Sequence, residues 1–228
     1  MYVANHFRLP DDRIEVLLKS VRPGNFVTVH DDGPVATFAP FHLEERASGR
    51  VLVTHLVRNN PQVREKPIGP AMAILDITDA YVSPLWYATN SDLPNVPTWD
   101  YVTIHVWGRP SFDFEPVGAL EAARQLTLRM EGPEVLEMVG DQKLQRMARA
   151  IVGVEIAIEK IEGKAKMSQN RHPDDVRSLI ARFDEYGPRE VADYLREVSL
   201  PYAEARFGEI ERIGAEHRLP TFGAGTRS

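Results

Sequence analysis

The sequence contains no cysteine among its 228 residues. Disulfides, zinc sites with thiolate ligands, iron–sulfur clusters and thiolate-ligated haem are therefore excluded, and histidine remains the natural ligand for a softer metal. No apolar run approaches the roughly 18 residues of a membrane helix. The N-terminus MYVANHFRLPDD also lacks a basic and apolar leader. We expect a cytoplasmic protein without a membrane span.

Basic residues are also fewer than acidic ones. The chain has 27 Lys and Arg against 33 Asp and Glu, for a net charge of −6. A nucleic-acid surface needs clustered basic residues, and the sequence shows no such cluster. Its apolar content of 43% is ordinary for a soluble domain. We therefore expect a globular protein that binds a small molecule, not a nucleic acid or a membrane.

Short β-type segments bounded by Pro, Gly, Asn and Asp dominate most of the chain, as is typical of antiparallel barrels. The expected strands are 25–30, 34–43, 51–57, 71–75, 80–83, 101–107 and 151–161. Helical spacing predicts a first helix capped by Asp11 or Asp12 and ended by Arg22-Pro23-Gly24. Further helical segments are expected at 62–66, 115–131 and 134–150, and a polar loop over 87–97 is a candidate lid.

The last part of the chain has a different character. From Pro173 onward, three amphipathic segments each begin with a proline at or near the first helical position. The pattern predicts a small β-barrel domain over 1–172 and a helical extension over 173–228, with a frayed tail at 221–228. The expected fold class is mainly β with α, that is, α+β.

The stretch from Val51 to Gly108 carries unusual residues at its strand ends. Planar rings, a guanidinium and amides stand where Gly, Asp and Ser are usual, and such groups suit a flat, charged organic ligand. Alternation places Val51, Val53, His55 and Val57 on one face of a strand that is apolar on both sides. We expect His55 to lie inside the protein and this segment to form the wall of a cofactor site.

Several motifs resemble the PaiB family in the same order, from Met1 to about Arg171. They are MY…HF, THLVRNNPQ, AYVSPLWY, VPTWDY, HVWG, IVGVEI and IEGKAKMSQNR. The resemblance implies FMN-binding negative transcriptional regulators with a split β-barrel of the pyridoxamine-phosphate-oxidase type. It also implies a homodimer with cofactor sites at the subunit interface, where His55, Arg58 and Asn59 would contact the flavin phosphate.

The same family includes haem-dependent piperazate synthases, which form an N–N bond in an N-hydroxylated ornithine. This sequence departs from the regulator pattern at Val3-Ala4, where the family has Pro, at Leu85 in SPLWY, and at Asp100 in PTWDY. A Trp-bearing stretch near residue 135 is also missing, and the C-terminal helices look longer. These departures favour a haem-dependent N–N cyclase, with an FMN-dependent oxidoreductase or a non-catalytic regulator as alternatives.

His55 is the candidate axial haem ligand and catalytic residue, with His105 and His6 as rivals. The alternative for His55 is a core histidine bonded to the backbone. Arg58 suits a phosphate or a haem propionate, or else a surface salt bridge. Asp100 is the second candidate catalytic residue, because a carboxylate can hold a substrate ammonium or accept its proton. Its alternative is a turn hydrogen bond.

The remaining candidates would surround the ring or the anionic end of the cofactor. Isolated aromatic residues more often belong to a core, and a bare pair of lysines is more often solvated. The full set of expected cofactor contacts is His55, Arg58, Asn59, Tyr81, Ser83, Trp86, Tyr87, Trp99, Lys164, Lys166 and Gln169. The expected cofactor is haem, with FMN as the alternative.

Overall fold

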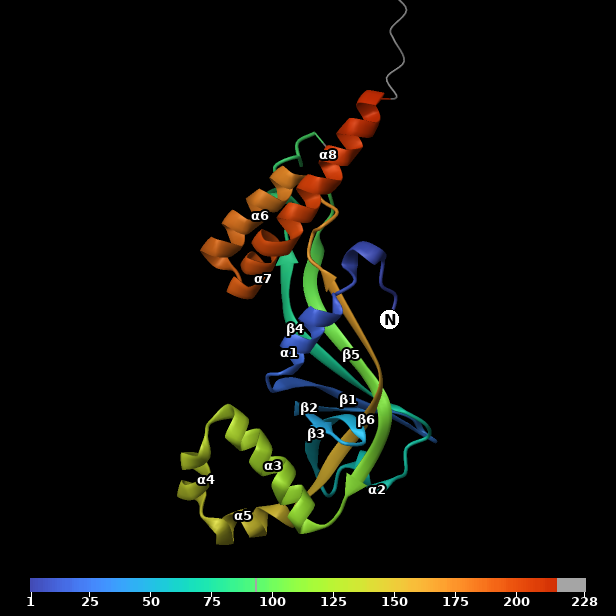
Figure 1. The fold of residues 1–228 in the computed structure, drawn as a ribbon, viewed down its shortest axis with the longest axis vertical. Coiled ribbons are helices and arrows are strands. Elements are labelled where there is room, and N and C mark those ends of the chain that lie inside the picture. The colour runs from blue at the N-terminus through green and yellow to red at the C-terminus, as the bar shows by residue number, and fades with distance from the viewer. Residues whose placement is uncertain (93, 217–228) are drawn as a thin grey trace, which may run out of the picture. The chain divides into compact units, whose positions relative to one another are not determined.

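A computed structural model describes residues 1–92 and 94–216. Six antiparallel strands close into a barrel in the order β1-β2-β3-β6-β5-β4 (Figure 1). The strands are β1 (Arg22–His30), β2 (Gly33–Arg46), β3 (Gly49–Val57), β4 (Ala71–Val82), β5 (Thr98–Asp113) and β6 (Ile151–Lys166). The predicted tail at 221–228 lies outside the described residues.

Helices occupy the segments between and after the strands. They are α1 (Asp11–Leu18), α2 (Pro61–Arg64), α3 (Pro116–Met130), α4 (Pro133–Val139), α5 (Asp141–Ala148), α6 (Pro173–Tyr186), α7 (Arg189–Tyr194) and α8 (Leu200–Glu216). Short 3₁₀ helices span Asn5–Phe7 and Pro84–Trp86, and a π-helical segment spans Leu195–Ser199. Helix α1 begins after Pro10 without a side-chain cap, so the predicted cap at Asp11 or Asp12 is wrong; both lie in the first turn.

The hairpin of β1 and β2 turns at Gly33, whose φ of 118° needs a glycine. The prediction that residues 22–24 end the first helix is wrong. Helix α1 already ends at Leu18, and residues 22–24 belong to β1 and pair with β2. Gly24 is needed where β1 approaches β4: a Cβ there would lie 2.3 Å from the Ile74 carbonyl oxygen. Gly24 therefore marks a close approach between two strands. In the sequence alone, such a glycine looks the same as one that marks a turn.

Strand β4 is continuous, whereas the sequence predicted a break at 76–79. Both aspartates of that segment, Asp76 and Asp79, are exposed. The Asp76 carboxylate accepts a hydrogen bond of 2.8 Å from the Thr103 hydroxyl of β5. Charged residues are therefore tolerated within the strand, because both side chains reach solvent.

Close contacts divide the chain into two compact units. The first comprises 1–78 and 101–165 and contains most of the barrel with α1 to α5. The second comprises 79–100 and the chain from Lys166 onward, and its core includes Val176, Leu179, Val191 and Leu195. The predicted domain boundary at residue 172 stays a prediction. The second compact unit begins at Lys166 in this part of the chain and also includes 79–100.

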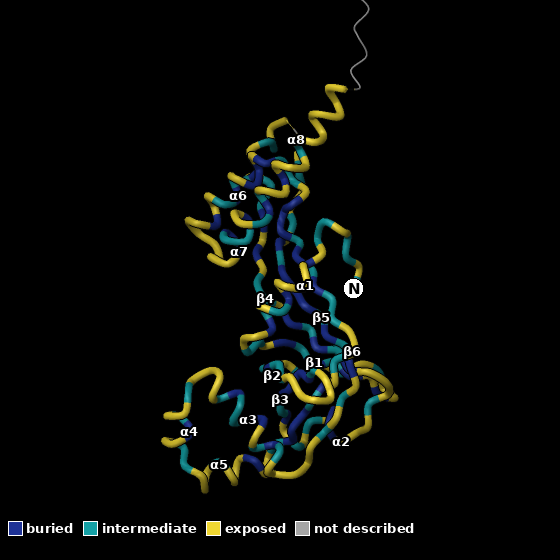
Figure 2. Tube along the Cα trace, viewed as in Figure 1, coloured by how far each residue is buried: buried dark blue, intermediate teal, exposed yellow. Residues whose placement is uncertain are grey.

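In the first unit, α3 lies against the outer face of β3 while α4 and α5 are largely exposed (Figure 2). The buried side of α3 consists of Ala119, Ala122 and Leu126, and Ala122 packs with Val51 and Val53. Two small alanines let the helix approach the sheet closely. None of the helices described is long and apolar enough to cross a membrane.

Candidate functional site

The predicted site residues fall into two groups, one in each compact unit. The first unit holds His55, Arg58, Asn59 and Lys164, together with the rivals His6 and His105. The second unit holds Tyr81, Ser83, Trp86, Tyr87, Trp99, Asp100, Lys166 and Gln169.

Arg58 is engaged by the backbone of its own unit. Its guanidinium donates to the carbonyl oxygens of Arg149 at 3.1 Å, Phe114 at 2.8 Å and Ile151 at 3.3 Å. It also lies 5.8 Å from the centre of the Phe114 ring. The side chain therefore ties β3 to the start of β6 and the end of β5. This role differs from the predicted contact with a phosphate or propionate, because most of its donors are already in use.

The rest of the RNNPQ motif is also structural. Asn60 caps α2 by accepting from the Gln62 backbone NH at 2.9 Å. Gln62 is fully buried, and its amide donates to the Phe26 carbonyl at 3.0 Å and the Thr28 hydroxyl at 2.8 Å. Asn59 is exposed. The motif thus fastens the first hairpin to the end of β3, and its rare residues reflect the demands of buried hydrogen bonds.

His55 lines a cavity of 450 Å³ between the sheet and helices α3, α4 and α5. The lining is mostly apolar and includes Leu120, Leu126, Leu136, Leu144, Met130 and Met147, with Arg124 and Glu131 as its charged residues. Burial lowers the pKa of His55, so the imidazole is neutral at pH 7. Its Nδ1 is buried and has no hydrogen-bond partner among the described residues.

The strand register explains why His55 faces this cavity. Pairing of His42 with Val53 places Pro40 opposite His55, and both Pro40 and His55 line the cavity. His105 and His6 do not line it. The centre of the His105 ring lies 5.4 Å from that of Trp107, and the centre of the His6 ring lies 4.0 Å from that of Phe7, with the rings tilted in both pairs. Among the described residues, no group of three or more His, Asp or Glu side chains is arranged to hold a bare metal ion.

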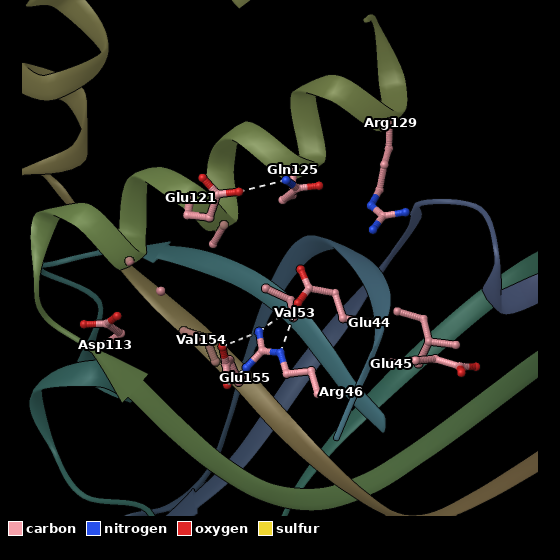
Figure 3. A pocket seen from close by; sticks show the side chains of 14 residues that line it. Glu44, Glu45, Arg46, Val53, Asp113, Glu121, Gln125, Arg129, Val154 and Glu155 are labelled. Atoms are coloured by element: carbon pink, nitrogen blue, oxygen red, sulfur yellow. Dashed lines mark hydrogen bonds and ion pairs between the residues drawn. The ribbon is translucent and has the colours of Figure 1, made fainter. Parts of the chain in front are cut away.

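A second cavity, of 480 Å³, lies on the other flank of α3 and is polar (Figure 3). Arg46 lies on its strand side, between Glu44 and Glu155, with a distance of 2.8 Å to each carboxylate. Glu121 and Gln125 of α3 face it and bond to each other at 2.7 Å. Its charged groups largely satisfy one another, so they suit a stable surface better than a ligand.

His42 lies on the same sheet face and was not a predicted candidate. It is 1% exposed, and its Nε2 lies 2.8 Å from the Glu44 carboxylate, while Nδ1 has no partner among the described residues. Burial lowers its pKa, against the opposing effect of Glu44. The signal in the sequence is the alternating pair His42 and Glu44, which places both on one face of β2.

In the second unit, Asp100 forms the centre of a buried polar cluster. Its side chain is fully buried, and Oδ2 accepts a 2.7 Å hydrogen bond from the Ser168 hydroxyl. Oδ1 has no hydrogen bond, and Lys166 Nζ lies 3.7 Å from it. Burial raises the pKa of Asp100 to about 6, against the opposing effects of Ser168 and Lys166. The carboxylate is enclosed by protein groups in this structure, and its contact with a substrate ammonium stays a prediction.

Other predicted contacts join the same cluster. Lys166 donates to the Thr98 hydroxyl at 2.7 Å and to the Trp99 carbonyl, and the Gln169 side chain accepts from the Met167 NH at 2.8 Å. Burial raises the pKa of Tyr87, against the opposing effects of Arg171 and Ser168, and its buried hydroxyl has no hydrogen-bond partner among the described residues. These side chains are packed against protein, so their predicted role as cofactor contacts gains no support from their surroundings.

The remaining aromatic and polar candidates are spread along the segment 81–99. Tyr81 and Trp99 are about half exposed and form an edge-on pair at 6.1 Å. Trp86 packs edge-on against Phe183 of α6 at 5.6 Å, and Ser83 caps the short helix at 84–86 by accepting from Leu85 NH. In the first unit, Lys164 Nζ lies 5.3 Å from the centre of the Tyr101 ring.

Sequence comparisons connect the barrel to a known family. A family model described as "Putative FMN-binding domain" matches residues 1–160, which is more than half of the chain. The chain belongs to this family. It is 26% identical over 189 residues to "Protease synthase and sporulation protein PAI 2" of Bacillus subtilis (strain 168), covering 79% of this chain and 87% of that protein. These matches confirm the predicted resemblance to the PaiB family.

Two further similarities are weaker: one spans a shorter stretch of the chain, and the other has a lower sequence identity. An uncharacterized protein of Saccharomyces cerevisiae is 32% identical over 83 residues, covering 35% of this chain and 49% of that protein. Among solved structures, the flavocytochrome Anf3 from Azotobacter vinelandii aligns with a TM-score of 0.55 and 12% identity over 72% of each chain. The structural likeness shows the fold alone. It confirms the predicted α+β split barrel with helices after it.

Proposed function

We propose that the chain is an FMN-binding split-barrel oxidoreductase, and that the cofactor ring lies in the His55 cavity. Both walls of this cavity, the strand that carries His55 and the helices α3 to α5, lie within the residues matched by the FMN-binding family. The observation that carries the proposal is this cavity: an apolar space of 450 Å³ that ends on a neutral imidazole.

The chemistry of the cavity suits the ring of a flavin. Such rings bind between apolar walls and are oriented by a few polar groups. His55 can donate or accept one hydrogen bond at the polar edge of the ring, and Arg124 is the cation of the lining that can face a phosphate. The bound cofactor would supply electron transfer, while the chain excludes water and fixes the ring.

Titration with FMN tests this proposal. We expect the purified chain to quench flavin fluorescence on binding, and we expect His55→Ala and Arg124→Ala each to weaken FMN binding by about tenfold or more. His105→Ala is the matched control, because burial lowers the pKa of His105 as well, yet it lines no part of the cavity. Unaltered FMN affinity in both cavity variants would contradict the placement of the ring.

A second candidate is haem bound in the same cavity, with His55 as the iron ligand. The observation in its favour is the spare ring nitrogen of a neutral histidine within an apolar wall. Haem would supply a Lewis-acidic iron, as a piperazate synthase-like N–N cyclase requires. It ranks second because a histidine that binds a metal through one ring nitrogen is normally fixed by a hydrogen bond from the other, and among the described residues neither ring nitrogen of His55 forms a hydrogen bond.

The colour of the purified protein separates the candidates. Two broad bands in the blue and near ultraviolet indicate flavin, and one intense violet band indicates haem. If haem binds, His55→Ala should change the iron spectrum, while His105→Ala should leave it unchanged. A colourless protein that takes up neither compound would favour the non-catalytic regulator. The homodimer, the amino-acid substrate and the cytoplasmic location stay predictions.

A further inference from the structure

A third hollow in the first unit has different chemistry from the two cavities beside α3. It is an open groove of 970 Å³ between the segment that follows α2 and the end of β5. Its lining includes Arg64, Lys66, Arg109, Phe112 and Phe114, and three prolines stiffen its rims. It shares no lining residue with the His55 cavity.

The cations of this groove are not all used by the protein. Arg109 pairs with Glu159 at 2.8 Å. The side chains of Arg64 and Lys66, by contrast, are exposed and have no partner among residues 1–92 and 94–216. The carboxylates of the lining are Glu65 and Glu159, so positive charge is in slight excess. Two neighbouring free cations are suited to one phosphate, which accepts several charge-assisted hydrogen bonds.

The groove is also lined by aromatic rings from the end of β5 and the residue after it. Phe114 is 46% exposed, and its position is fixed because Arg58 donates to its carbonyl at 2.8 Å and lies against its ring. Phe112 is the second ring and is partly buried. A ring held in place in this way can stack on a planar ligand with little loss of side-chain freedom.

We propose that this groove binds a nucleotide, with its phosphate on Arg64 and Lys66 and its base against Phe112 and Phe114. The site is separate from the His55 cavity and does not depend on which cofactor that cavity takes. A lone phosphate would leave the rings unused, and an uncharged ring would leave both cations unpaired. The two parts of a nucleotide match the two parts of the groove.

Calorimetric titration of the full chain with AMP tests the proposal. We expect AMP to bind, and adenosine and inorganic phosphate each to bind at least about tenfold more weakly. The double variant Arg64→Ala/Lys66→Ala should lose AMP binding by tenfold or more. The control is Lys143→Ala/Arg146→Ala, which removes the same charge from exposed positions of α5 that do not line the groove and should leave AMP affinity unchanged.

Two outcomes would overturn the proposal. One is absence of AMP binding at millimolar concentration, or binding that the Arg64→Ala/Lys66→Ala variant retains. The other is loss of FMN binding in that variant together with displacement of AMP by FMN, which would make the groove the flavin's own site. Failure of His55→Ala to affect FMN or haem would contradict the proposed cofactor site and leave the nucleotide groove unaffected, so the two proposals fail separately.

Discussion

His55 in the first unit and Asp100 in the second are both titratable groups taken largely out of water, and their surroundings differ. His55 borders 450 Å³ of apolar space and keeps a ring nitrogen without a partner. Asp100 is packed against Ser168 and Lys166 and borders none of the three cavities described above. A group beside empty space can serve a ligand, whereas a group enclosed by partners serves the fold.

The same difference, between a group beside empty space and a group enclosed by protein, separates polar residues that the sequence suggested for a single site. Rare polar residues at strand ends suggested one ligand site, yet Arg58 and Gln62 are occupied by protein groups, and the unpartnered Oδ1 of Asp100 borders none of the three cavities. The chemistry of a side chain is therefore a weaker guide to a site than unused hydrogen-bonding capacity that borders a cavity. On this measure, His55 in the cavity and Arg64 and Lys66 in the groove are the better candidates.

The largest effect that would test this comparison is the pH dependence of stability due to Asp100. Burial raises its pKa to about 6 in the folded state, from 3.8. The folded state then holds its proton more tightly, so this stabilisation is complete below about pH 4 and is lost as the pH rises through 6. The loss is on the order of 3 kcal/mol. Urea unfolding of the wild type between pH 4 and pH 8 measures it.

Asp100→Asn is the matched variant, because it keeps the shape and removes the titration. The difference in unfolding free energy between wild type and variant should shift in favour of the variant as the pH rises through 6. A difference that stays constant across this range would mean that Asp100 is ionised with ease in the folded state. It would then not be enclosed by its protein partners, and the contrast with His55 would disappear.

Much of the fold could be predicted from local patterns. The alternation at 51–57 and 101–107 and the prolines that open the C-terminal helices correspond to β3, β5 and α6 to α8. The errors came from long-range partners. The predicted break in β4 is wrong because Thr103 of β5 bonds to Asp76, and Gly24 belongs to a strand because β4 passes close to it. No local pattern carries that information.

The candidate site could also be predicted only in part, because local patterns do not show long-range partners. The strand pattern placed His55 inside the protein, and it does line a cavity. The acceptors of Arg58, however, are carbonyls of Phe114, Arg149 and Ile151, which are 56 to 93 positions away in the sequence. The pairing of His42 with Glu44 and the free cations of the groove also depend on which strands become neighbours.

A smaller effect is expected at Ser168, which has a left-handed φ of 57°. Ser168→Ala removes the hydroxyl that donates to Asp100 and should lower the unfolding free energy at pH 7 by about 2 kcal/mol. Ser168→Gly loses the same bond but relieves the left-handed backbone, so it should be less destabilising than Ser168→Ala by about 1 kcal/mol. Equal losses in the two variants would show that the backbone there is not strained.

The smallest effect is expected at His55. Its Nδ1 is buried without a partner, and the ring borders empty apolar space, so a leucine of similar size removes an unsatisfied polar group and keeps the packing. His55→Leu should leave the unfolding free energy of the cofactor-free chain unchanged or raise it by up to about 1 kcal/mol. Urea unfolding at pH 7 measures this, with cofactor binding measured on the same sample. A loss of stability comparable with that of Ser168→Ala would place His55 among the residues that serve the fold, because a side chain kept for a ligand is one that the empty protein can lose without cost.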